Sequence, residues 1–354
     1  MTLLAHSPST RFNEPIDLTA TEPPEQRGLT RDGVRLLVAG RDGVAHTTFR
    51  QLTEHIGAGD LVVVNNSATI AAELDAALDG RPVALHLATP LDDGDWVIEL
   101  RTAPDAAQPI LDARPGQQIT AGAVTMRLVA PYPQDGGSPI GSGNRLWRAA
   151  LAGSRRALDR RIVRHGRPIA YGYLAGRWPL AAYQTVFATE RGSAEMPSAG
   201  RPFTDVLVAA LLAKGATIAP ITLHTGVSSQ EANEPPQPER YAVSAETARL
   251  VNAARLAGRR VIAVGTTVTR ALESAVGADG LVRESRGWTT LVIDPDHPVR
   301  AVNGLITGLH NPEASHLLLV EAVAGPELTQ RAYDEAFAAG YLWHEFGDSC
   351  LLLP

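Results

Sequence analysis

Two different hydrophobic patterns divide the chain. Between about Asp75 and Gly153, short runs of alternating apolar and polar residues are separated by turn sequences such as DDGD at 92–95. Strands at this spacing, with no helical period between them, predict a small β-barrel or sandwich. From about Ser154 onward, strand-length apolar runs alternate with helical patterns, which is typical of an α/β layer. We therefore predict an α/β main domain of residues 1–75 and 154–354, with an all-β, barrel-like domain of residues 76–153 inserted into it.

The α/β part contains several distinct elements in this pattern. Strand-length apolar runs lie at 35–39, 59–66, 218–223 and 260–264. Helical patterns cover 49–56, 245–257 and 267–276. Ser244 is a suitable N-cap for the second of these helices. An aromatic run at 183–188 predicts a further strand.

The composition excludes several classes of protein. Hydrophobic residues make up 44% and charged residues 20% of the 354 residues, which is typical of a soluble, core-forming chain. Cys350 is the only cysteine, so no internal disulfide can form and a reducing compartment is expected. The longest apolar runs, such as 61–64, are too short to span a membrane, and the N-terminus lacks the pattern of a signal peptide. We expect a cytoplasmic protein without a membrane partner.

Charge and motifs narrow the chemistry. The net charge of −6 argues against a surface that grips nucleic acid all over, although a local basic patch is compatible with it. The sequence contains no His-Glu-x-x-His, Cys-x-x-Cys, P-loop or Gly-x-Gly-x-x-Gly motif. Neither a metal nor a nicotinamide cofactor is therefore predicted.

The clearest local signal is the segment 260–273, in which an apolar strand is followed by a glycine, paired threonines and an amphipathic helix. Ligands of open α/β sheets bind at the carboxyl ends of strands, where a helix N-terminus offers free N–H groups to an anion. Gly265, Thr266 and Thr267 are therefore candidate ligand-binding residues. Arg270 and Glu273 share one face at i,i+3 spacing. The pattern is equally typical of a threonine-capped helix with a solvated Arg–Glu pair.

A second candidate site is the segment 183–204, which joins the aromatic run to a loop of small residues that opens a helix. Small residues allow the backbone to approach a planar ligand, and Tyr183 or Phe203 could stack on a base. Packing of these rings in the core is the simpler alternative. His224 and His310 lie at element ends, where catalytic groups often occur. A lone histidine there is more often a hydrogen-bonded structural residue.

Residues 154–167 carry six arginines and one aspartate. If this segment is helical, Arg156, Arg160 and Arg164 share one face at i,i+4 spacing, and Arg155 precedes them. In an acidic protein this is the best candidate for a surface that faces a polyanion. The alternative is a solvated face that pairs with acidic neighbours.

Several segments, in collinear order from about Asp17 to the C-terminus, resemble the S-adenosylmethionine:tRNA ribosyltransferase-isomerase family of queuosine biosynthesis. They are GDLVVVNN at 59–66, YQTVFA at 183–188, PSAG at 197–200, LHTG at 223–226, RVIAVGTTVTRALES at 260–274 and the segment 341–348. The resemblance implies an α/β domain with an inserted β-barrel, in agreement with the patterns above.

The resemblance also implies an unusual reaction. S-adenosylmethionine donates its ribosyl group to the aminomethyl group of a 7-deazaguanine at the wobble position of a tRNA, adenine and methionine leave, and the ribose carbons become an epoxycyclopentane. The sulfonium acidifies the adjacent ribose C–H, so a modest base can remove the proton. S-adenosylmethionine is then a co-substrate, tRNA is a partner through Arg155, Arg156, Arg160 and Arg164, and no metal is needed. We expect a monomer or a weak dimer.

Residues that match the family segments receive roles from this resemblance. The catalytic candidates are His224, as acid or base, with Arg270 and Glu273. The candidates for binding the co-substrate are Asn65, Asn66, Tyr183, Gln184, Gly200, Phe203, Gly226, Gly265, Thr266, Thr267 and His310. Among them, Tyr183, Gln184 and Phe203 would shape the nucleoside pocket, and Thr266, Thr267 and Arg270 would bind the methionyl or ribose end. The pattern leaves the identity of the base open.

Several positions depart from the family pattern. Arg201-Pro202-Phe203 stands in place of Leu-His-Phe, and Ser67-Ala68 in place of Thr-Arg. In the segment 341–348, Leu342 replaces an arginine and Glu345 adds an acid where the family has a serine. The lost cations and histidine affect recognition of a tRNA more than binding of S-adenosylmethionine. Two alternatives follow: an S-adenosylmethionine-dependent lyase, cyclase or transferase acting on a small molecule, and a degenerate nucleoside-binding protein without turnover.

Overall fold

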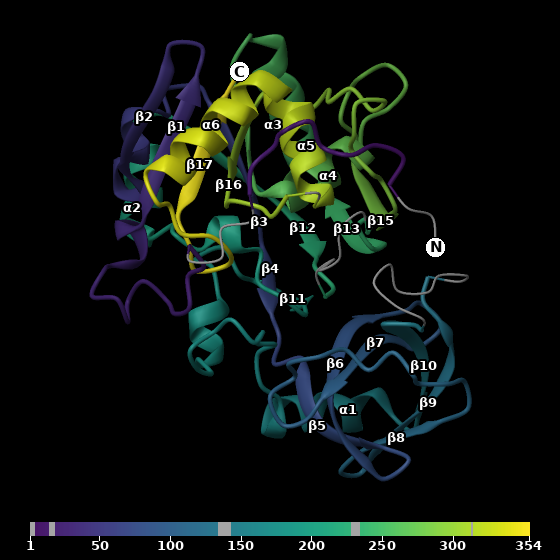
Figure 1. Ribbon diagram of the computed structural model, residues 1–354. Helices are drawn as coiled ribbons and strands as arrows, with labels where there is room; N and C mark the ends of the chain where they lie inside the picture. The colour runs from purple at the N-terminus through teal and green to yellow at the C-terminus, as the bar shows by residue number, and fades with distance from the viewer. Residues whose placement is uncertain (1–3, 14–17, 134–142, 228–233, 313) are drawn as a thin grey trace.

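The computed structural model describes residues 4–13, 18–133, 143–227, 234–312 and 314–354. Figure 1 shows a large α/β unit and, beneath it, a small β-barrel. The strands of the large sheet are β1 (Arg35–Gly40), β2 (Gly43–Thr48), β3 (Leu61–Asn65), β12 (Thr217–His224), β13 (Glu239–Val243), β14 (Val261–Val264), β15 (Ser285–Thr289), β16 (Gly304–Thr307) and β17 (Ser349–Leu353). The helices are α1 (Arg155–His165), α2 (Asp205–Ala213), α3 (Ala245–Leu256), α4 (Thr266–Ser274), α5 (Ser315–Ala324) and α6 (Pro326–Ala338), with the 3₁₀ helices η1 (Arg31–Gly33), η2 (Phe49–Glu54), η3 (Leu180–Tyr183) and η4 (Ser198–Gly200).

The described strands of the large sheet follow the order β15-β13-β12-β3-β14-β16-β17-β1-β2. The central strands β12, β3, β14 and β16 are parallel, so their carboxyl ends meet at one edge. β3 is buried along its whole length and continuously apolar up to Asn65, as expected for a parallel strand covered on both faces. β17 is antiparallel to β16 and enters the sheet from the same edge.

Helices cover both faces of this sheet. Apolar residues of α3, α4, α5 and α6 form one core with side chains such as Val63 of β3. On the opposite face, α2 and η2 pack against Val62 and Val64 of the same strand. The alternation along β3 places successive valines in different cores, as the two-residue period of a strand requires.

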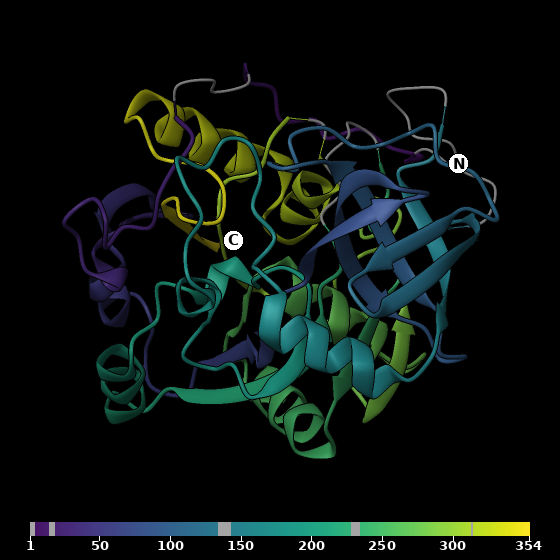
Figure 2. The ribbon, with the colours of Figure 1, turned by 90° about the horizontal axis from the view of Figure 1, so that it is seen from below.

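The inserted unit is a closed barrel. Its strands are β5 (Glu73–Leu78), β6 (Arg81–Pro90), β7 (Trp96–Thr102), β8 (Gln118–Ala121), β9 (Val124–Pro131) and β10 (Leu146–Ala152), in the order β10-β7-β6-β5-β8-β9. Leu158 and Ile162 of α1 pack on the barrel core beside Trp147. Figure 2, a view from below, shows α1 lying across the outside of the barrel. The predicted fold class, an α/β domain with an inserted all-β barrel, is confirmed.

Charged side chains are buried in the barrel and where it meets the main domain, and we call them the barrel charge network: Glu73, His86, Glu99, Arg101 and Arg145 of the barrel unit, with Glu234, which follows β12 and pairs with Arg145 at 2.8 Å. The imidazole of His86 bridges two carboxylates, with Nδ1 3.1 Å from Glu99 and Nε2 3.3 Å from Glu73. Glu99 also accepts from Arg101 at 2.9 Å and from Arg145 at 3.1 Å. Burial would lower the pKa of His86, but its hydrogen bonds to the two carboxylates raise it overall, which favours the protonated ring.

Two local predictions fail. The run 183–188 is not a strand: Tyr183 ends η3, and the residues that follow are irregular. The side chain of Gln184 accepts from the backbone N–H of Thr69 and donates to its carbonyl, so a side chain replaces the strand partner. The helix expected at 49–56 is the shorter 3₁₀ helix η2. Ser244, by contrast, caps α3 as predicted, with its hydroxyl 3.1 Å from the Thr247 N–H. Among the described helices, none has the length and apolarity to cross a bilayer.

Candidate active site

A cavity of about 750 Å³ opens where the parallel strands end. Its walls come from the residues that follow β12, β14 and β16, from the segments around 168–173 and 194–199, from 344–345 before β17, and from Arg101 of the barrel. The volume suits one small-molecule ligand. The position agrees with the rule that open α/β sheets bind ligands beyond the carboxyl ends of their strands.

The N-terminus of α4 forms part of one wall. Gly265 has a φ of +93°, and a Cβ at this position would lie 3.2 Å from the Cβ of Ala199, so a glycine is required. Within the described part of the chain no side chain caps the first turn of α4, which leaves its N–H groups available. Thr266 and Thr267 line the cavity here, as the sequence predicts.

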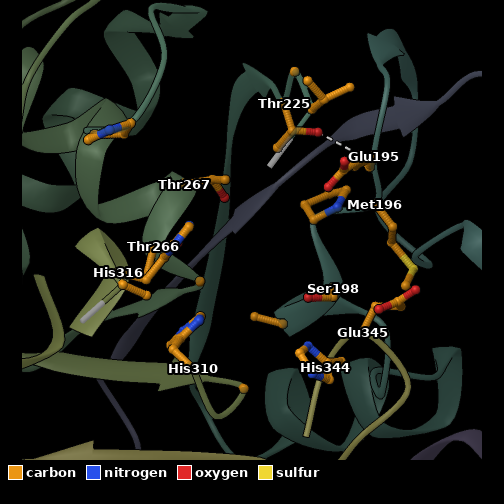
Figure 3. Close-up of a pocket in the computed structure, with 18 of the residues that line it drawn as sticks. Glu195, Met196, Ser198, Thr225, Thr266, Thr267, His310, His316, His344 and Glu345 are labelled. Carbon is orange, nitrogen blue, oxygen red and sulfur yellow. Dashed lines mark hydrogen bonds between the residues drawn. The ribbon is translucent and has the colours of Figure 1, made fainter. Parts of the chain in front are cut away.

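Two histidines stand beside this helix terminus (Figure 3). The rings of His310 and His316 are stacked, with centroids 4.9 Å apart and planes 9° from parallel. His310 Nε2 lies 2.9 Å from the Thr307 hydroxyl, and in the described residues Nδ1 has no hydrogen-bond partner. Burial lowers the pKa of His310 well below its usual range, and the neighbouring histidines add to the effect. Burial likewise lowers the pKa of His316 to about 4. Both rings are neutral at physiological pH.

The opposite wall is acidic. Figure 3 shows Glu195, Met196, Ser198, His344 and Glu345 facing Thr266, His310 and His316 across the cavity. The Tyr171 hydroxyl donates to Glu195, and the Tyr173 hydroxyl donates to Glu345. The ring of His344 stacks on Tyr173 at 4.6 Å. His344 has a φ of +70°, which is uncommon for a residue other than glycine and marks a constrained position at a site.

Arg270 lines the cavity but is already neutralised. Its guanidinium pairs with Glu239 and donates to the Leu291 carbonyl at 3.1 Å. Desolvation lowers the pKa of Arg270 from its ordinary value, although an arginine stays charged. The solvated Arg270–Glu273 pair considered from the spacing does not form. Glu273 instead accepts from the backbone N–H groups of Arg300 and Ala301, outside the cavity lining.

The structure brings seven of the fourteen predicted site residues to the cavity wall: Tyr183, Gly226, Gly265, Thr266, Thr267, Arg270 and His310. The other seven are not part of the lining: Asn65, Asn66, Gln184, Gly200, Phe203, His224 and Glu273. Asn65 ties strands together, because its amide bonds both the N–H and the carbonyl of Leu223. Asn66 accepts from the Thr222 hydroxyl at 2.7 Å. These asparagines hold the sheet edge beneath the cavity.

His224 lies behind the wall. It is the last residue of β12, and its Nδ1 is 2.7 Å from the hydroxyl of Ser67, which is itself 2.6 Å from that of Ser193. The backbone of Gly192 passes so closely that a Cβ there would come within 2.5 Å of the imidazole. Burial lowers the pKa of His224, with the charge of Arg240 adding to it. These contacts are those of a structural histidine.

Phe203 is fully buried, packed edge-on against Phe49 at 5.0 Å and Phe187 at 5.2 Å. We expect Phe203→Leu to lower the free energy of unfolding by about 1 kcal/mol, because the leucine fills most but not all of the aromatic volume. Calorimetric affinity for S-adenosylmethionine, the co-substrate that the resemblance implies, should stay unchanged. A tenfold loss of affinity in a variant that melts like the parent would show instead that the ring contacts ligand.

Sequence reasoning missed much of the acidic wall. Tyr171, Tyr173, Glu195 and His316 were not selected, and Glu345 was noted only as a departure from the family pattern. The available signals were the alternating tyrosines at 171 and 173 and the acid directly before Met196-Pro197 in the small-residue loop. Outside the cavity, His6, Asp294 and Asp296 bring possible metal-ligand atoms within 4.8 Å of one another. The imidazole of His6 lies 3.2 Å from Asp294 and 3.6 Å from Asp296, and these contacts account for the cluster.

Comparison with known proteins agrees with this architecture. A family model described as "Queuosine biosynthesis protein" matches residues 9–352. S-adenosylmethionine:tRNA ribosyltransferase-isomerases of Acidiphilium cryptum and Symbiobacterium thermophilum are each 35% identical over 353 residues, covering 96% and 97% of this chain and 97% and 98% of their own. The crystal structure of an S-adenosylmethionine tRNA ribosyltransferase from Thermotoga maritima is 28% identical, covers 97% of this chain and 99% of its own, and gives a TM-score of 0.53. The resemblance found in the sequence is thereby confirmed, and the chain belongs to the queuosine biosynthesis protein family.

Proposed function

We propose that this protein is an S-adenosylmethionine:tRNA ribosyltransferase-isomerase. It transfers the ribosyl group of S-adenosylmethionine to the aminomethyl group of a 7-deazaguanine in tRNA and isomerises it. The observation that carries the proposal is the family match over nearly the whole chain. The ligand-sized cavity at the carboxyl ends of the parallel strands supports it, because a metal-free reaction of a small co-substrate needs an enclosed, dipole-lined site.

The donor's methionyl end fits the N-terminus of α4. The methionyl carboxylate would accept from the uncapped N–H groups after Gly265 and from the hydroxyls of Thr266 and Thr267. Arg270, held by Glu239, acts here as a positioning residue for the neighbouring loop, since its charge is already balanced. Tyr183 adds a buried phenol without a hydrogen-bond partner in the described residues, which a ligand atom can satisfy.

His310 is the candidate base in place of His224. It lies in the cavity, Thr307 fixes its ring, and its unbonded Nδ1 is available to a ligand. The neutral imidazole can take the proton from the carbon next to the sulfonium, and the resulting imidazolium can return a proton to the departing adenine. Because the sulfur already carries the positive charge, the electrons left on carbon are stabilised within the substrate itself.

The arginine-rich helix α1 is the candidate tRNA-binding surface. Arg156, Arg160 and Arg164 are exposed, and within the described part of the chain they form no ion pair. Replacing all three by glutamine is expected to weaken tRNA binding and to reduce the slope of log K against log salt by about 2 to 3, because each phosphate contact contributes about 0.7–0.9. Filter binding at four salt concentrations measures this. Arg249→Gln, on the exposed face of α3, is the control, and an unchanged slope in the triple variant would rule out α1.

The function is tested with purified protein, labelled S-adenosylmethionine and a tRNA that carries 7-aminomethyl-7-deazaguanine. Release of free adenine and of methionine, together with transfer of ribosyl label to the tRNA, is the expected result. Absence of all three products would overturn the proposal.

A second candidate function is favoured by one observation. Glu345 lies on the cavity wall, at a position where the family pattern implied by the resemblance has a serine. An acidic pocket attracts a cationic amine, and that amine can belong to a small-molecule acceptor as well as to a modified base of a tRNA. The same assay without RNA separates the two: turnover with a free amine acceptor supports the second function, and strict dependence on tRNA rejects it.

A further inference from the structure

Two tyrosine–glutamate pairs form one wall of the cavity. Tyr171 donates to Glu195 and Tyr173 donates to Glu345, and all four residues line the cavity. The two tyrosine rings stack with centroids 6.1 Å apart. Glu195 and Glu345 lie on the same side, across from His310 and Thr266 (Figure 3). The wall is therefore one ordered unit that presents two carboxyl groups to whatever enters.

Glu345 lacks the cation that a partly buried carboxylate normally has. In the described part of the chain it accepts from a neutral phenol and forms no ion pair, whereas Glu239 in the same cavity is paired with Arg270. Burial raises the pKa of Glu345 to about 7, and the charge of Glu195 also raises it. A cation that binds between these carboxyl groups would stabilise their ionised forms.

Tyr171, which donates to Glu195, is held by contacts with the barrel, and its ring stacks on that of Tyr173. The ring of Tyr171 meets His86 edge-on at 6.5 Å, and the Arg101 guanidinium lies 5.6 Å from its centroid. Both contacts belong to the barrel charge network. A rigid support of this kind keeps the carboxyl groups in place before the ligand arrives, which is what a specific site needs.

We propose that Glu195 and Glu345 form the binding site for the acceptor's primary ammonium group, with Glu345 as the group that accepts its proton and Tyr171 and Tyr173 as positioning residues. This inference rests on the proposed function. In the step, an N–H bond of the ammonium breaks and an O–H bond forms on the Glu345 carboxylate. The freed nitrogen lone pair then forms the C–N bond to a ribosyl carbon. Adenine leaves with the electrons of its own C–N bond and takes the proton held by the His310 imidazolium, and methionine leaves in the isomerisation with the electrons of its C–S bond.

The family pattern that the resemblance implies has a serine in the place of Glu345, so by that resemblance the site is an addition in this chain. It predicts stronger selection of a charged amine than the family reaction requires. The ligand that this site would bind is a primary ammonium group attached to a flat heterocycle. That group can belong either to a nucleotide of a tRNA or to a free base. Both sources are therefore arms of the test.

The test compares Glu345→Gln with the parent protein, because the amide keeps the shape and removes the charge. The probes are tRNA with 7-aminomethyl-7-deazaguanine, the same tRNA with guanine, and free 7-aminomethyl-7-deazaguanine. The parent should bind at least one aminomethyl probe about 10- to 100-fold more tightly than the guanine tRNA, as a hydrogen-bonded charge pair allows. Glu345→Gln should lose this preference and keep its affinity for S-adenosylmethionine.

A kinetic readout distinguishes this role from a structural one. In Glu345→Gln the acceptor must arrive as the neutral amine, so kcat/KM should rise about tenfold per pH unit up to the amine's own pKa near 10. Glu345→Asp should recover part of the parent's shallower profile. Tyr173→Phe should weaken the amine preference less than Glu345→Gln does.

The outcomes separate the two proposals. Glu190→Gln, which changes an exposed acid at the start of β11 (Glu190–Ser193), is the matched control and should behave as the parent. If Glu345→Gln and Glu195→Gln both keep the amine preference and the parent's pH profile, the ammonium site is overturned while the proposed function stands. A parent protein that releases no adenine overturns the proposed function, and amine preference in binding still tests the site.

Discussion

Replacing His310 by glutamine is expected to reduce the turnover of S-adenosylmethionine by about 10²- to 10⁴-fold, the usual contribution of a general base. We expect this loss because His310 lines the cavity and its Nδ1, unbonded within the described residues, is free to reach the substrate, while its Nε2 is bonded to the Thr307 hydroxyl. Glutamine can keep the bond to Thr307 but cannot take a proton. The fold should persist, because the backbone N–H of His310 still donates to the Tyr333 hydroxyl. Adenine release under single-turnover conditions measures the effect, and calorimetry measures donor affinity.

His224→Gln is the matched control. This histidine is the candidate that the family resemblance favours, yet it bonds Ser67 outside the cavity lining. We expect turnover within a few-fold of the parent. The reverse pattern, with His224→Gln inactive and His310→Gln active in folded proteins, would return the role of base to His224.

The pH profile adds an independent check on His310. Burial lowers its pKa well below the usual 6.5, so the basic, neutral form persists as the pH falls. The rate of proton removal by this base, measured as solvent-deuterium exchange at the carbon next to the sulfonium, a step in which Glu345 takes no part, should therefore hold between pH 7.5 and pH 6. An unperturbed histidine would lose about three quarters of its neutral form by pH 6. A decline of that size would contradict the assignment, once binding of both substrates is saturated.

Glu99→Ala should destabilise the barrel by about 3–5 kcal/mol, because it leaves buried cations without their partner. Glu99 is fully buried and accepts from His86, Arg101 and Arg145. Burial alone would raise its pKa, but the hydrogen bond from His86 and the nearby arginine charges lower it to about 2. Its ionised form thus stabilises the fold above pH 4.5, and this contribution disappears as the pH falls from 4.5 to 2.

Urea unfolding followed by tryptophan fluorescence measures this change, since Trp96 and Trp147 are buried in the barrel core. Asp112→Ala is the control within the same barrel. Its pair with Arg81 is exposed, so its removal should change stability by less than about 1 kcal/mol. Equal effects of the two substitutions would mean that the buried network contributes no more than a surface ion pair.

The part of the site that could be predicted follows from local patterns. The strand, glycine and helix signal at 260–273 correctly places Thr266 and Thr267 at the cavity, because the carboxyl ends of parallel strands form the binding edge. Phe203 shows where this reasoning stops. Its loop suggests a ligand, but its ring packs against Phe49 in the core on one face of the sheet, a contact between segments about 150 residues apart in sequence.

The acidic wall depends on contacts that no local pattern contains. Tyr173 and Glu345 are 172 positions apart and meet only in the folded chain. The amino-acid composition shows neither that these two residues form a hydrogen bond nor that they lie on the cavity wall. The predicted strand at 183–188 fails for a similar reason, because the Gln184 side chain bonds the Thr69 backbone where a strand partner was expected.

The contact between Tyr171 and the interior of the barrel has a consequence for engineering. Excising residues 76–153 and rejoining the flanks would remove His86 and Arg101, the neighbours that steady this ring from behind. A shortened enzyme of that kind would keep its sheet but lose the backing of its acidic side. The barrel is thus no detachable module for grafting or trimming: repacking its interior around His86 would alter the support of Tyr171 and, through it, the acidic side of the cavity.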